Sequence, residues 1–169
     1  MKKKNGSIMI TTLISFSIVS IICIGCIGII NSNNEIIDIN YKSTIVKYKL
    51  KGVLELVYSK VLEEVNNTIE KSKISENPQN YFKNYFLIDN KNNFIYKIEN
   101  INLDDLEVYV VNNKVYMENN HIRFDITCNN KTNNIKKSYK SSFKIKTDFD
   151  FNNNTDLNEI VIKYNSQEI

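Results

Sequence analysis

The feature that most constrains this chain is an uncharged, apolar run near its N-terminus. Residues Ser7 to Ile30 include no Asp, Glu, Lys, Arg or His. As a helix that rises about 1.5 Å per residue, the run covers roughly 36 Å, which is more than the roughly 30 Å hydrocarbon core of a bilayer. Lys2 to Lys4 precede the run, and no basic residue follows it before Lys42. The positive-inside rule therefore predicts a single-pass transmembrane helix over 7–30, with a cytoplasmic N-terminus and an extracytoplasmic C-terminal part.

Two other N-terminal signals are alternatives to a retained anchor. A cleaved secretory signal needs a shorter apolar core and an Ala-x-Ala-like site, and the run has neither. A lipoprotein signal would use Cys26, which follows Gly25. However, Cys23 occupies the position where a leucine-like residue is expected, and the apolar run continues through 27–30. We therefore prefer a retained membrane anchor.

The short leader before the anchor resembles one family. Lys2-Lys3-Lys4-Asn5-Gly6 is similar to the basic, Gly-ending leader of type IV pilins and of the pseudopilins of type II secretion and competence systems. The resemblance implies cleavage between Gly6 and Ser7 by a prepilin peptidase. It also implies other pilin-like subunits, membrane assembly machinery and membrane lipid as partners. The family usually carries Glu at the fifth mature position, which is Thr11 here, and this departure implies a minor, tip-type subunit.

Beyond the anchor, the sequence pattern becomes that of an amphipathic helix. We predict this helix over 31–75, ending before Pro78, because proline disfavours helix in the residue that precedes it. Asn31 to Asn34 could interrupt the helix or form a polar part of it, and the sequence leaves both open. A coiled coil is the alternative, but the apolar steps are nearer to 3.6 than to 3.5 residues. The apolar positions are Ile36, Ile39, Val46, Leu50, Val53, Val57, Val61, Val65 and Ile69.

The apolar pattern after Pro78 changes to a period of two, which predicts an antiparallel β domain over 79–169. A first hairpin is expected from 85–88 and 94–98, and a second from 106–111 and 114–118 with the tight turn Asn112-Asn113. Further strands are expected over 121–128, 143–151 and 160–162. The amphipathic helix would cover one face of this sheet, so the predicted fold class is α+β with a pilin-like arrangement. In the 143–151 strand, the buried face is formed by Phe143, Ile145, Thr147, Phe149 and Phe151.

No catalytic constellation is found, and we expect neither an enzyme nor a cofactor or metal. Glycine is absent after Gly52, which excludes glycine-rich phosphate loops from the outer domain. The single histidine, His121, follows Asn119-Asn120 and is interpreted as a strand-end surface residue. The acidic residues 104, 105 and 107 lack the ligand spacing of a calcium loop and are interpreted as a solvated turn.

A lysine-rich segment raises the question of nucleic-acid binding. Six lysines and no acidic residue lie between Lys131 and Lys146, with Tyr139 and Phe143 between them. We prefer the interpretation that these lysines form the solvent face of a strand, because Phe143 points into the core by alternation.

These patterns predict a minor pilin-like or pseudopilin-like structural subunit. It would help to initiate or cap a type IV pilus, a type II secretion pseudopilus or a competence pseudopilus. The alternative is a permanently membrane-tethered extracytoplasmic domain that binds or senses a ligand and forms no fibre. A lipoprotein-like surface module is a third hypothesis.

Overall fold

A single long helix opens the computed structural model, which describes residues 2–101, 103, 105–131, 135–151 and 156–169. Helix α1 spans Lys2–Ser72, three residues short of the predicted end at 75. It runs through Asn31 to Asn34 without a break, so this polar stretch belongs to one continuous helix. The chain divides into two compact units, Met1–Lys42 and Ser43–Ile169.

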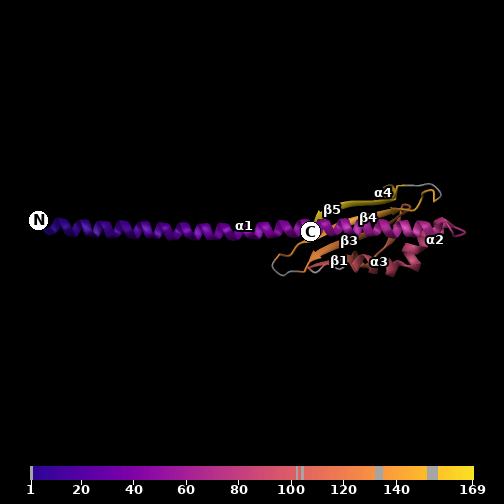
Figure 1. Ribbon diagram of the computed structural model, residues 1–169, viewed down its shortest axis with the longest axis horizontal. Coiled ribbons are helices and arrows are strands. Elements are labelled where there is room, and N and C mark those ends of the chain that lie inside the picture. Colours follow the sequence, from indigo (N-terminus) through magenta and orange to yellow (C-terminus); the bar gives the residue numbers. More distant parts are fainter. Residues whose placement is uncertain (1, 102, 104, 132–134, 152–155) are drawn as a thin grey trace. The chain divides into compact units, whose positions relative to one another are not determined.

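The second half of α1 supplies the helical layer of the C-terminal unit (Figure 1). Leu50, Val57, Val61 and Val65 are fully buried, at steps of seven, four and four residues. This spacing places them on one face of a 3.6-residue helix, as the sequence predicts. The predicted stripe is therefore confirmed from its middle onwards, whereas Ile36 and other apolar residues in the first unit are exposed.

The predicted hairpin over 85–98 is wrong, because this segment is helical. Helix α2 (Pro78–Asn84) continues into the π-turn η1 (Tyr85–Asp89) and then into α3 (Lys91–Glu99). The Asn77 side chain accepts a hydrogen bond from the backbone N–H of Asn80 at 3.1 Å, and Pro78 occupies the first turn of α2. An asparagine cap followed by proline starts a helix, and the short apolar runs after it fit a helix as well as a strand. The predicted β domain over 79–169 thus begins with helices, and its sheet starts at Leu106.

The sheet has five antiparallel strands, and the α+β fold class is confirmed. They are β1 (Leu106–Val110), β2 (Tyr116–Glu118), β3 (His121–Asn130), β4 (Ser138–Lys146) and β5 (Val161–Glu168). The order is β1-β3-β4-β5, and β2 pairs with the other end of β3 on the same side as β1. The short helix α4 (Leu157–Ile160) precedes β5, so the predicted strand over 160–162 begins one residue later and runs further.

The predicted hairpin turn at Asn112-Asn113 is misplaced. These residues do adopt positive φ, at 56° and 48°, but they belong to the 3₁₀ turn η2 (Val111–Asn113), and both flanking strands pair with β3. The two-residue hairpin turn is instead Asn119-Asn120, with φ of 49° and 59°, between β2 and β3. Asparagine tolerates the left-handed region better than other non-glycine residues. All positive-φ residues in the described part of the chain are asparagines, which here take the role that glycine usually has.

The core of the C-terminal unit contains a continuous series of aromatic contacts. Phe94 of α3 meets Phe124 of β3 edge-on at 5.3 Å between ring centroids, and Phe124 stacks on Phe143 of β4 at 5.3 Å. The ring centroid of Tyr58 on α1 lies 6.4 Å from that of Phe143. These contacts join α1, α3 and the sheet around one buried layer. The predicted buried face of residues 143–151 is confirmed, although β4 itself ends at Lys146.

Candidate functional site

The described side chains of α1 from Ile8 to Ile30 form an apolar surface that the protein itself does not cover. They are exposed, except for the half-buried Ser20. One helix near the N-terminus is long and apolar enough to cross a membrane. Its most apolar 18-residue window has a mean hydropathy of 2.7, and no part of that window is buried in the protein. Such a surface is suited to lipid rather than to water.

Four hydroxyl groups in this segment donate to carbonyls of the helix that carries them. Ser15 Oγ donates to the Thr11 carbonyl at 2.9 Å, and Ser20 Oγ donates to the Phe16 carbonyl at 2.9 Å. Thr12 and Ser17 make the equivalent bonds, to Met9 and Leu13. Unpaired polar groups cost several kcal/mol in hydrocarbon, so this internal bonding is what a lipid-exposed helix needs.

The residues that the pilin resemblance singles out all lie on α1. The backbone of Gly6 and Ser7 is helical, and Thr11 is exposed one turn further on. Cleavage between Gly6 and Ser7 remains a prediction. Cys23 and Cys26 are exposed free thiols on the same helix.

The sequence did not single out a buried carboxylate on α1 of the C-terminal unit. The side chain of Glu64 is only 3% exposed and lies 2.7 Å from Lys97 Nζ of α3. Tyr85 donates its hydroxyl to Glu64 Oε2 at 3.2 Å. The hydrogen bond from Lys97 to Glu64 raises the Lys97 pKa, against the effect of burial. The sequence does contain one signal for a buried carboxylate here, because Glu64 follows the buried Val61 by three residues and so lies on the same side of the helix. Its contacts with Lys97 and Tyr85 indicate a structural link between α1 and the segment that includes α3.

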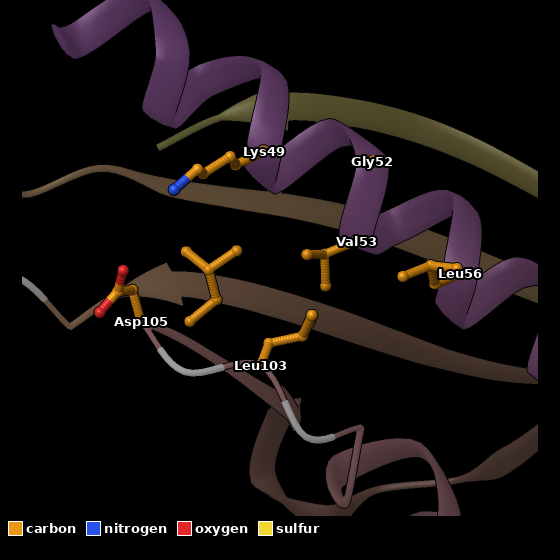
Figure 2. A pocket seen from close by; sticks show the side chains of 7 residues that line it. Lys49, Gly52, Val53, Leu56, Leu103 and Asp105 are labelled. Carbon is orange, nitrogen blue, oxygen red and sulfur yellow. The ribbon is translucent and has the colours of Figure 1, made fainter.

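An open hollow of about 360 Å³ lies beside α1 (Figure 2). Its lining is mainly apolar. Lys49 of α1 and Asp105 of the segment before β1 lie at the end opposite Leu56, on facing walls (Figure 2). Leu103 and Asp105 come to this place through the fold, so the sequence did not reveal the hollow. The lining residues are Lys49, Gly52, Val53, Leu56, Leu103, Asp105 and Leu106.

Two of the six lysines in the segment 131–146 pair with neighbouring acidic groups. Lys140 lies 2.8 Å from Asp125, and Lys137 pairs with Glu168. Lys144 lies over the Tyr164 ring, 5.3 Å from its centroid. These partners lower the local excess of positive charge that a phosphate backbone would attract. Nucleic-acid binding therefore stays the less favoured prediction.

The remaining candidate residues are His121, the acidic residues before and within β1, and Cys128. His121 is half-buried at the start of β3, and its Nδ1 lies 2.7 Å from the Asn119 carbonyl oxygen. Asp105 and Glu107 are exposed, while Asp104 lies outside the described residues. Among the described residues, no group of three or more His, Cys, Asp or Glu could hold a metal ion. Burial raises the pKa of the Cys128 thiol to about 12, so little thiolate forms there at neutral pH.

Comparisons with known proteins assign no family. No family model, no curated protein and no solved structure matches the chain.

Proposed function

We propose that this chain is a minor pilin-like or pseudopilin-like structural subunit. The observation that carries the proposal is the basic leader ending at Gly6, directly before the uncharged helix segment. The helix continues without a break into a domain in which it packs on an antiparallel sheet, and this arrangement supports the same proposal. In this function the N-terminus is cytoplasmic, the domain is extracytoplasmic, and the chain helps to initiate or cap a fibre.

Thr11 supports a position at the fibre tip. A carboxylate in the membrane is costly unless it finds a partner. In the type IV pilins and pseudopilins that the leader resembles, the glutamate at this position is thought to pair with the terminal amine of a neighbouring subunit. A tip subunit has no earlier neighbour to pair with, so threonine avoids the cost of an unpaired carboxylate.

The test is the N-terminus of the protein isolated from membranes of its own host. The proposal expects a mature chain that starts at Ser7, measured by intact-mass and N-terminal peptide mass spectrometry. A variant with Gly6→Val should keep the leader and serves as the control for peptidase specificity. A wild-type chain that still starts at Met1 or Lys2 would rule out this function, and a lipidated Cys26 would establish a lipoprotein instead.

The second candidate function is a permanently tethered extracytoplasmic domain that binds or senses a ligand. The specific observation in its favour is the same Thr11, because a tether needs no carboxylate in the membrane. This function expects an uncleaved leader together with stable membrane localisation. Membrane fractionation of the Gly6→Val variant and the wild type would then give the same result.

A further inference from the structure

Helix α1 carries an exposed apolar stripe at the start of the C-terminal unit. We use "the exposed stripe" for Ile45, Tyr48, Gly52 and Leu56, which follow one another at steps of three, four and four residues. Tyr48 is 68% exposed and Leu56 is 54% exposed. Such steps keep side chains on one side of a helix. The stripe ends at Leu56, because the polar Ser59 and Glu63 follow at the same spacing.

The exposed stripe runs along the edge of the hollow. Gly52 and Leu56 belong to both, and Leu103 and Leu106 form the other wall. A Cβ atom on Gly52 would meet nothing within 4 Å, so the missing side chain leaves open space on the helix surface. Single exposed apolar side chains are ordinary, but a stripe beside an apolar hollow indicates a surface that another protein covers.

Two opposite charges lie at one end of the hollow. Lys49 and Asp105 have opposite charges on facing walls at the same end of the hollow (Figure 2). Neither makes an ion pair with another residue in the described part of the chain. In a two-fold interface, if one residue of the first copy contacts a given residue of the second copy, the same contact occurs again with the copies exchanged. A two-fold axis along the stripe would therefore bring Lys49 of each copy to Asp105 of the other.

We propose that the exposed stripe and the hollow form a homodimer interface, in which α1 of a second copy packs in parallel across Gly52. The membrane anchor favours this occupant, because every copy carries the stripe at the same distance along the chain from the same anchor. Copies in one membrane thus meet in parallel and in register, at a raised effective concentration. The absent side chain at Gly52 lets the two helices approach closely. This dimer does not depend on a fibre, since a tethered domain in the same membrane would form it as well.

Disulfide cross-linking of the full-length protein in membranes tests the contact. The background is Cys23→Ala with Cys26→Ala, which leaves only the buried Cys128. Leu56→Cys should give a disulfide-linked homodimer on mild oxidation. The control is Lys146→Cys, another exposed position, on the sheet face that points away from the core, and it should stay monomeric. Leu56→Cys that cross-links no more than Lys146→Cys, or only to a different protein, would overturn the proposal.

Charge reversal then tests the two-fold geometry, with Leu56→Cys cross-linking as the readout. Lys49→Glu should lower the apparent association constant of the dimer by at least about fivefold, since the two symmetry-related pairs of residue 49 with Asp105 become repulsive. Lys49→Glu combined with Asp105→Lys should restore it, because the reversed charges again face each other. Gly52→Leu should block the dimer while the monomer fold is kept, because the added Cβ would meet no atom of its own chain within 4 Å. A double reversal that cross-links no better than the single one would show that these charges do not face each other across the interface, which contradicts the proposal.

Discussion

The ion pair between Glu64 and Lys97 gives the sharpest test of how α3 is held on α1. Lys97 Nζ lies 2.7 Å and 2.9 Å from the two Glu64 carboxylate oxygens. The carboxylate is 3% exposed, whereas the lysine side chain is 37% exposed. Removing one partner of a fully buried pair costs about 3–5 kcal/mol, because the other charge is left without compensation. Here water reaches the lysine side, so we expect Lys97→Met to lower the free energy of unfolding by about 2–3 kcal/mol.

Two comparisons make this expectation specific to the buried carboxylate. Lys60 is 35% exposed, close to the value for Lys97, but it pairs with Glu63, which is 56% exposed. Lys60→Met should therefore change the free energy of unfolding by no more than about 0.5 kcal/mol. The double variant Glu64→Leu with Lys97→Met removes both charges and should be more stable than Lys97→Met alone, because no buried charge remains.

Urea unfolding of the full-length protein in mild detergent measures these differences. The chain has no tryptophan, so near-UV circular dichroism of its tyrosines is the readout. The unfolding midpoint and the slope against urea should be fitted separately, since only a midpoint change at constant slope reports stability. If Lys97→Met and Lys60→Met shift the midpoint equally, the buried carboxylate does not hold α3 as described.

Three further outcomes follow from the fold. Glu64 raises the pKa of Lys97 above its ordinary 10.5, and burial and Glu64 raise that of Tyr85 above 10.0. Both groups therefore contribute their full stability at pH values below their ordinary pKa, and this contribution is lost as the pH rises through their raised pKa. The urea midpoint of the wild type should therefore fall above about pH 10 in a pH series. The midpoint of the Glu64→Leu, Lys97→Met double variant should fall less. Phe124→Ala should cost about 3–5 kcal/mol in urea unfolding, because it empties the centre of the aromatic layer, and a cost below about 1 kcal/mol would contradict that packing. Asn120→Ala should cost about 1 kcal/mol at φ 59°, whereas Asn120→Gly should not, and thermal unfolding of both variants compares them.

Local pattern was enough to predict the parts of the fold in which a long period repeats. The spacing of Leu50, Val57, Val61 and Val65 predicts their common buried face, because apolar residues recur on the same side of the helix over several turns. The alternation through Phe143 and its neighbours predicts the core face of β4 for the same reason. These elements needed no knowledge of their partners.

The wrong predictions have two physical causes. Short apolar runs such as 85–88 are compatible with helix and strand, and the cap at Asn77 decided for helix. Pairing between strands is a long-range property, so Asn112-Asn113 and Asn119-Asn120 look equivalent in the sequence although only the second pair closes a hairpin. The hollow escaped prediction for a related reason, since Asp105 and Lys49 come to line the same hollow only through the folding of the chain between them.

The hydroxyl bonds within the apolar part of α1 tie polar side chains to the backbone of their own helix. Ser15 and Ser20 donate to carbonyls four residues earlier in their own helix, and they need no donor or acceptor from outside. Polar residues can therefore stand within the apolar run without the several kcal/mol that an unpaired polar group would cost in hydrocarbon.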